Sequence, residues 1–265
     1  MSTPYLMENE EEIRRLELKT DAAVVERYAT MAGLKPGMRV VDVCCGAGVT
    51  TSILGKLTGP SGSALGVDFS PERIDHARTQ YGNKGTTFVR HDVRQSFSDL
   101  GSFDFAWVRF ALEYFRQESS AIVAHLAEAL NPGGILCLID LDHNCLNHYG
   151  LSERLERGLS SVIHQVENEG NFDPYAGRKL YSHLYKLGFA GIGVDAAAHH
   201  LIYGDLNQID AYNWTRKIEV ITRNLTIAIP GYTSPQEFLD DFLQFFRDPG
   251  RFTYTPVIAC WGKKN

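Results

Sequence analysis

The chain has 265 residues and a formal net charge of −6, with 26 basic and 32 acidic side chains. This length can bury one large α/β core with an insertion or cap, but two fully separate domains would be crowded. The acidic balance gives no long-range attraction for a phosphate backbone, so we expect no nucleic-acid partner. No apolar run reaches the roughly 18 residues of a membrane span, and the first residues are acidic where a signal peptide is basic. We therefore expect a cytoplasmic protein without a membrane partner.

The stretch ahead of the first strand has the spacing of one or two amphipathic helices over residues 8–32. We interpret residues 1–35 as a helical arm that packs against the domain. The positions expected to be buried in it are Ile13, Leu16, Val24, Tyr28 and Met31.

Short apolar runs then alternate with helical stretches, which is the rhythm of a doubly wound α/β sheet. Most of the early runs are continuously apolar, and this predicts parallel strands that are covered on both faces. The expected strands are residues 38–44, 63–68, 86–90, 103–109, 134–140, 192–203 and 252–262.

The first strand runs into a glycine turn, and residues 40–48 read VVDVCCGAG. Gly46 and Gly48 let the backbone approach a ligand closely, and the first N–H groups of the next helix form a polar cradle. A dinucleotide fingerprint would have a third glycine or alanine at Thr51, and the Gly-Lys-Ser/Thr of a P-loop is absent. The turn therefore predicts a nucleoside-like ligand and no dedicated phosphate grip.

Carboxylates recur where successive strands end, which is the edge at which open α/β sheets bind ligands. These are Asp42, Asp68 and Asp92. Asp68 follows the first turn glycine by 22 residues, close to the spacing of a carboxylate that binds ribose hydroxyls. Asp92 can accept a hydrogen bond from an exocyclic amine, with Phe69 and Val93 on either side of a base. Three acids in register are stronger evidence than one.

Cysteine and histidine pairs raise the alternative of a metal or redox centre. The adjacent Cys44 and Cys45 have no second ligand pair at metal-site spacing, so we interpret them as small apolar packing residues. His199 and His200 lie in an expected strand, where neighbouring side chains point to opposite faces. We therefore expect no metal site.

Five motifs in this order resemble the class I S-adenosylmethionine-dependent methyltransferase family, small-molecule type. The resemblance covers residues 36–142, and its motifs are VVDVCCGAG, GVDFSPE, RHDV, FDFAWVRFALEYF and LNPGGILCLID. The chain departs from the family at Cys44, where glycine is usual. What the resemblance implies is a Rossmann-like, mostly parallel seven-stranded sheet of order 3-2-1-4-5-7-6 whose last strand is antiparallel.

The resemblance also implies S-adenosylmethionine as the cofactor. In that reading Asp68 binds the ribose, Asp92 with Val93 holds the adenine, and the loop from Gly46 to Gly48 faces the methionine part. The full set of expected cofactor-binding residues is Asp42, Cys44, Gly46, Gly48, Asp68, Phe69, Asp92, Val93 and Arg109.

A sulfonium methyl group is already activated, so transfer is an in-line displacement that needs alignment and exclusion of water. A hydroxyl or protonated amine acceptor would need a base. The candidates follow the fifth strand, with His143 first and Asp142 second. Arg109 ends the fourth strand, where it could clamp a carboxylate or pair with Glu113 four residues later.

We expect the residues that determine substrate specificity to lie outside the core motifs, in two segments that we interpret as helical caps. These segments are residues 143–190 and 204–251. Helices are expected over 151–168 and 175–187. The second segment carries phenylalanines at helical spacing, and such a stripe indicates core more often than pocket. The stripe consists of Phe238, Phe242, Phe245 and Phe246.

The leading hypothesis is a single-domain enzyme that transfers a methyl group to an O, N or S atom of a small, partly apolar acceptor, as a monomer or homodimer. One alternative is a nicotinamide-dependent oxidoreductase, which would want the missing glycine at Thr51. Another is a non-catalytic protein that binds S-adenosylmethionine, because intact motifs do not prove turnover.

Overall fold

A computed structural model describes residues 12–223 and 228–265. Over these residues the chain forms a mixed eight-stranded sheet of order β3-β2-β1-β4-β5-β8-β6, in which β7 also pairs with β8. The strands are β1 Arg39–Val43, β2 Ser63–Asp68, β3 Thr86–Arg90, β4 Phe103–Arg109, β5 Leu130–Leu141, β6 His148–Tyr149, β7 Ala190–Tyr203 and β8 Phe252–Lys263. Strands β1 to β5 are parallel to their neighbours, and β8 is antiparallel to β5 and β7. With β7 and β8 as the sixth and seventh expected strands, the predicted order is confirmed, and β6 is an unpredicted addition.

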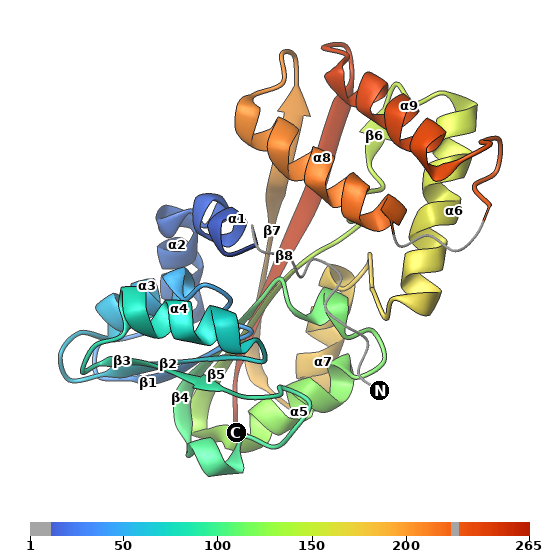
Figure 1. The fold of residues 1–265 in the computed structure, drawn as a ribbon. Coiled ribbons are helices and arrows are strands. Elements are labelled where there is room, and N and C mark those ends of the chain that lie inside the picture. Colours follow the sequence, from blue (N-terminus) through green and yellow to red (C-terminus); the bar gives the residue numbers. More distant parts are fainter. Residues whose placement is uncertain (1–11, 224–227) are drawn as a thin grey trace.

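The sheet is covered by helices on both faces (Figure 1). The described helices, including those of the lobe discussed below, are α1 Glu12–Lys19, α2 Ala22–Ala32, α3 Val49–Thr58, α4 Pro71–Tyr81, α5 Ser119–Ala129, α6 Glu153–Glu169, α7 Leu180–Lys186, α8 Gln208–Arg223 and α9 Pro235–Arg247. Three short 3-10 turns are η1 Ser98–Leu100, η2 Leu112–Tyr114 and η3 Gly177–Lys179. Local sequence explains the helix starts: Ser70 accepts a hydrogen bond from the Arg73 N–H at the start of α4, and Pro71 follows at the first turn.

Alternate side chains of the central strands supply two apolar cores. Val40 faces a cluster with α2 and α3, whereas its neighbour Val41 faces a cluster with α5 and α7. Because both faces are buried, the strands can be continuously apolar, as the sequence indicated. In α2, Tyr28 is buried as expected, but Met31 is 42% exposed because it lies on the solvent side of the helix.

A separate lobe stands at one end of the sheet, where β7 and β8 extend beyond the other strands (Figure 1). It contains β6, α6, α8 and α9 and has its own apolar cluster. Phe238, Phe242 and Phe246 are almost fully buried in that cluster, so the aromatic stripe of α9 is core, as predicted. The expected cap helix over 175–187 differs, because α7 packs Leu180 and Leu184 into the main core under the sheet.

Candidate functional site

The glycine turn between β1 and α3 depends on left-handed backbone. Cys44, Gly46 and Gly48 have φ values of 57°, 55° and 92°. Cys44 adopts this conformation although it has a side chain, which is strain of the kind that collects at functional sites. A Cβ on Gly46 would lie 2.8 Å from Leu16 of α1, so the turn and α1 are in close contact.

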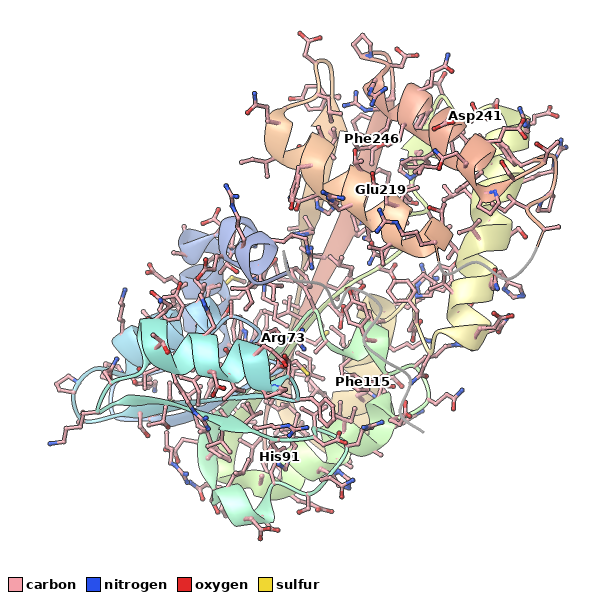
Figure 2. All side chains as sticks on the ribbon, viewed as in Figure 1. Arg73, His91, Phe115, Glu219, Asp241 and Phe246 are labelled. Carbon is pink, nitrogen blue, oxygen red and sulfur yellow. The ribbon has the colours of Figure 1, made fainter. Side chains whose placement is uncertain are left out.

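A cavity of about 830 Å³ opens beside this turn, at the carboxyl ends of β1, β2 and β4. Its walls also include Leu16 and Thr20 at α1 and residues 168–171 at the end of α6. Figure 2 shows that Arg73 and Phe115, which line it, lie where the sheet domain meets the upper lobe. The cavity therefore occupies the edge at which the sequence placed its acids, and α1 is one of its walls as well as a packing arm.

Asp68 ends β2 on this wall, and its carboxylate already accepts several hydrogen bonds. The N–H of Gly46 donates to Oδ2 at 3.0 Å, and the N–H of Ser70 donates to Oδ1 at 3.0 Å. The guanidinium of Arg73 donates to the same Oδ1 at 2.9 and 3.1 Å. No sequence pattern indicated this ion pair, which occupies one oxygen of the carboxylate predicted to bind the ribose.

A second arginine forms an ion pair with Asp92. Arg94 donates to both of its carboxylate oxygens, at 2.8 and 2.6 Å, and this hydrogen bond holds the pKa of Asp92 below its usual value. Phe69 and Val93 lie on the same wall. Phe69 is 52% exposed, so its ring is open to a ligand. An apolar slot with a carboxylate beside it can hold a base.

Asp42 and Arg109 form the polar floor of the cavity. Asp42 accepts a hydrogen bond from the Thr51 hydroxyl at 2.6 Å, and burial raises its pKa to about 7. Burial lowers the pKa of Arg109 to about 10, while its guanidinium lies 4.4 Å from the Phe110 ring centroid. The Nε of Arg109 is buried and has no hydrogen-bond partner among the described residues. The floor therefore presents a carboxylate and a guanidinium to the cavity.

Glu113, in η2, is a functional candidate that the sequence reading saw only as a partner for Arg109. Its side chain is 3% exposed and lines the cavity. The Asn144 amide donates to Oε2 at 2.6 Å, and the ammonium of Lys217 in α8 donates to Asn144 at 2.6 Å. Asp140, at the end of β5, accepts a hydrogen bond from the Glu113 N–H at 3.1 Å. The spacing of residues along the sequence could not reveal this network, because its members come from η2, the end of β5, the connection after β5 and α8.

The sequence comparison identifies the fold family. A family model described as a methyltransferase domain matches residues 40–134, which include the glycine turn and all three strand-end acids. Residues 40–134 therefore form a methyltransferase domain, and this part of the chain resembles the class I S-adenosylmethionine-dependent methyltransferases.

Curated relatives match the same region. The demethylmenaquinone methyltransferase of Lactococcus lactis subsp. lactis (strain IL1403) is 28% identical over 116 residues, which is 43% of this chain and 46% of that protein. The enzyme of the same name from Staphylococcus aureus (strain JH9) is 31% identical over 110 residues, which is 40% of this chain and 44% of that protein. The matches therefore span less than half the length of these relatives.

Solved structures share the fold over most of the chain. A putative methyltransferase from Bacillus halodurans C-125 has a TM-score of 0.60 at 15% identity, covering 91% of this chain and 99% of that one. The YcgJ protein from Bacillus subtilis has a TM-score of 0.61 at 15% identity, covering 92% and 100%.

Three of the predicted site residues do not line the cavity. Gly48 begins α3, where a Cβ would meet Ala77 at 2.7 Å, so its role is close packing. His143 packs its ring edge-on against Tyr175, and Asp142 accepts two hydrogen bonds from Arg178 at 2.8 Å. Both lie off the cavity because the chain after β5 stays bound to β8 through the Asp142 N–H and the Pro256 carbonyl. The remaining predicted cofactor residues do line it.

The structure also bears on the other features considered from the sequence: the cysteine pair, a metal site, the second cap segment and a membrane span. Burial raises the pKa of the Cys44 and Cys45 thiols well above the usual value, which keeps them neutral. Within the described ranges, no group of three or more metal-ligating side chains is present. The described part of 204–251 contributes no residue to the cavity wall. None of the helices in residues 12–223 and 228–265 combines the length and apolarity needed to traverse a bilayer.

Proposed function

We propose that this protein transfers the methyl group of S-adenosylmethionine to an O, N or S atom of a small acceptor inside the cavity between α1, the sheet edge and the end of α6. The main support for this proposal is the polar floor of the cavity, where Asp42 and the unpartnered Nε of Arg109 lie beside the glycine turn. A carboxylate that is ionised on binding and a guanidinium with an unpartnered Nε fit the ammonium and the carboxylate of an amino acid.

The remainder of the cavity fits an adenosyl group. Phe69 and Val93 would enclose the base, and Asp92 would accept its exocyclic amine. The free lone pairs of Asp68 Oδ2 would take a ribose hydroxyl, while Arg73 keeps Oδ1. When bound, the cofactor supplies an electrophilic methyl group on sulfur. A volume of about 830 Å³ is in the range of small-molecule sites, which supports a small acceptor.

The chain's own contribution is positioning and exclusion of water. The glycine turn fixes one wall, and α1 covers it through the contact of Leu16 with Gly46. Side chains of η2 and of residues 168–171 would border the acceptor. Because the leaving group is already activated, alignment of the acceptor with the methyl group supplies most of the catalysis.

Calorimetric titration with S-adenosylmethionine and, separately, with NAD tests the proposed cofactor. We expect saturable binding of the first and none of the second. Arg109→Met should weaken binding by roughly 10-fold or more, because it removes a charge-assisted hydrogen bond. Arg27→Met, at a half-exposed side chain on α2, is the matched control and should bind like the wild type. Binding of NAD instead would favour the oxidoreductase, and a protein that binds S-adenosylmethionine but never forms S-adenosylhomocysteine would be non-catalytic.

A further inference from the structure

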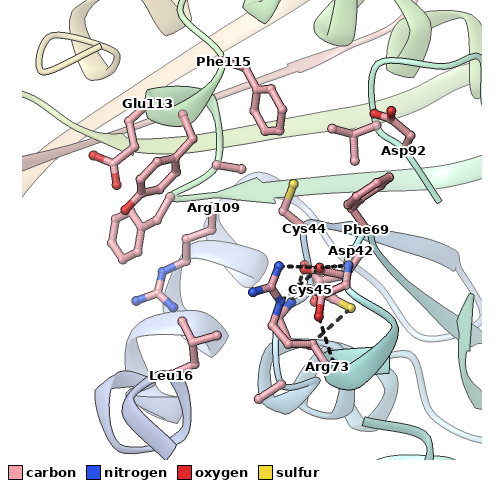
Figure 3. Close-up of a pocket in the computed structure, with 18 of the residues that line it drawn as sticks. Leu16, Asp42, Cys44, Cys45, Phe69, Arg73, Asp92, Arg109, Glu113 and Phe115 are labelled. Atoms are coloured by element: carbon pink, nitrogen blue, oxygen red, sulfur yellow. Dashed lines mark hydrogen bonds and ion pairs between the residues drawn. The ribbon is translucent and has the colours of Figure 1, made fainter. Parts of the chain in front are cut away.

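Glu113 is held in one direction by its backbone as well as by its side chain. The N–H of Glu113 donates to Asp140 Oδ2 at 3.1 Å, and its carbonyl accepts from the Asp173 N–H at 2.7 Å. Burial raises the pKa of Asp140 well above its usual value. The turn that carries Glu113 is therefore fixed from both sides, and its carboxylate stands at the cavity (Figure 3).

One oxygen of this carboxylate remains available to a ligand. Oε2 accepts the Asn144 amide, but Oε1 has no hydrogen-bond partner within the described part of the chain. The amide orientation is fixed, because the Lys217 ammonium can only donate and therefore faces the Asn144 oxygen. Asn144 must then donate to Glu113. The result is a largely buried side chain with one acceptor oxygen that is open to a ligand in the cavity.

The same end of the cavity carries further negative charge. Glu118 and Glu169 line it, and each has one oxygen held by a side-chain amide, from Asn171 and Gln165, both at 2.7 Å. The walls between these acids are aromatic. They are formed by Phe110, Tyr114 and Phe115.

Arginines also line the cavity, and two of them are already paired with carboxylates. Arg73 and Arg94 are bound to Asp68 and Asp92, and Arg109 lies beside the Phe110 ring near Asp42. The acceptor end thus combines carboxylates with aromatic faces, the combination that attracts an organic cation.

We infer that the methyl acceptor is an amine, which Glu113 Oε1 binds as an ammonium between the aromatic walls. This rests on the proposed methyl transfer. In the reaction an N–H proton passes to the Glu113 carboxylate, and the freed nitrogen lone pair attacks the methyl carbon. The new N–C bond forms as the C–S bond breaks, the electron pair returns to sulfur, and neutral S-adenosylhomocysteine leaves. Glu113 then returns its proton to water.

Three isosteric probes test the charge of the acceptor. Protein saturated with S-adenosylhomocysteine is titrated with 2-phenylethylamine, 2-phenylethanol and phenylacetate, which differ only in a cationic, neutral or anionic end group. We expect the amine to bind about 10-fold or more tighter than the alcohol, the size of one charge-assisted hydrogen bond, and the acid to bind weakest. Equal affinities, tighter binding of the alcohol or acid, or binding of none of the three would overturn the inference.

Glu113→Gln keeps the shape and an acceptor for Asn144 but removes the charge. We expect it to lower amine affinity to that of the alcohol while the affinity for S-adenosylhomocysteine and the melting temperature stay as in the wild type. Lys217→Met, which loosens Asn144, should reduce the amine preference partially, and Glu128→Gln, exposed on α5, should leave it intact. An unchanged preference in Glu113→Gln contradicts the assignment. Failure of the wild type to bind S-adenosylhomocysteine would instead contradict the proposed function.

Discussion

At the scale of single residues, the buried carboxylate of Asp42 links ligand binding to pH. Burial raises its pKa to about 7, against the lowering effect of the Thr51 hydrogen bond and the Arg109 charge. The folded protein therefore holds this proton more tightly than the unfolded chain does. Ionisation of Asp42 costs stability as the pH rises toward 7, whereas binding of a ligand ammonium requires the ionised form.

The affinity for S-adenosylmethionine should therefore fall as the pH drops below about 7, by up to about tenfold per pH unit, because binding must release the Asp42 proton. Calorimetry at pH 6 in two buffers of different ionisation enthalpy should detect that proton. Asp42→Asn should bind weakly with no pH dependence, and above pH 7 it should melt at or above the wild-type temperature. A wild-type dissociation constant that is the same at pH 6 and pH 8 would contradict this role.

The ion pair between Asp68 and Arg73 predicts competition for the ribose ligand. Arg73 is 8% exposed and binds Asp68 Oδ1, so it withholds that oxygen from a second ribose hydroxyl and leaves only Oδ2. Arg73→Leu should tighten binding of S-adenosylmethionine by roughly tenfold, about the effect of one charge-assisted hydrogen bond. Arg78→Leu, on the exposed side of α4, serves as the control. Weaker binding by Arg73→Leu would mean that the guanidinium supports the ribose site.

At the scale of elements, α1 is attached to the site by few contacts. Glu17 Oε1 accepts hydrogen bonds from His76 and Tyr81 of α4, at 2.9 and 3.0 Å. The His76 hydrogen bond lowers the pKa of Glu17, so this attachment is complete above the ordinary glutamate pKa and is lost as the pH falls through the lowered value. Leu16 of the same helix covers the glycine turn.

Glu17→Ala should therefore raise the dissociation constant of S-adenosylmethionine about fivefold, the effect of roughly 1 kcal/mol of lost hydrogen bonding, while the melting temperature changes little. The comparison is Glu26→Ala, an exposed position on α2. Titration calorimetry and thermal melting give the two readouts. If both variants bind like the wild type, α1 does not act as a wall of the ligand site.

At the scale of the whole molecule, the upper lobe and the sheet domain have separate apolar clusters. Phe242 is fully buried in the lobe, where it stacks with Trp214 and Phe246 at ring-centroid distances of 6.3 and 5.8 Å. The lobe reaches the cavity through residues 168–171 and through Lys217 by way of Asn144.

Phe242→Ala should destabilise the lobe by about 3 to 5 kcal/mol through the cavity it leaves. The floor of the proposed ligand site lies on β1 and β4, outside the apolar cluster of the lobe. Binding of S-adenosylmethionine at 10 °C should therefore persist. Leu126→Ala, buried in the main core under the sheet, should lower the stability of the ligand-binding part itself. The test is thermal unfolding with and without the ligand. Loss of binding in folded Phe242→Ala would show that the two clusters act as one unit.

The amino-acid sequence was sufficient for the architecture, because strand periodicity and turn residues are local properties. It located β1 to β5, the sheet order through the family motifs, and the acids of the carboxyl edge. It also predicted close approach of a ligand at Gly46 and Gly48, where a Cβ would instead meet Leu16 and Ala77 of the protein itself. The strand positions and the edge acids follow from side-chain patterning along one strand or turn, whereas the sheet order was implied by the family resemblance.

Only the tertiary structure decided which polar groups meet. Arg73 reaches Asp68 because α4 turns back over the end of β2, and Glu113 faces the cavity because Asp140, Asn144 and Lys217 converge on it from separate elements. His143 and Asp142 were expected at the site from their place after β5, but pairing with β8 carries them away from it. Contacts between distant segments depend on packing geometry in three dimensions, which a linear pattern of residues does not encode locally.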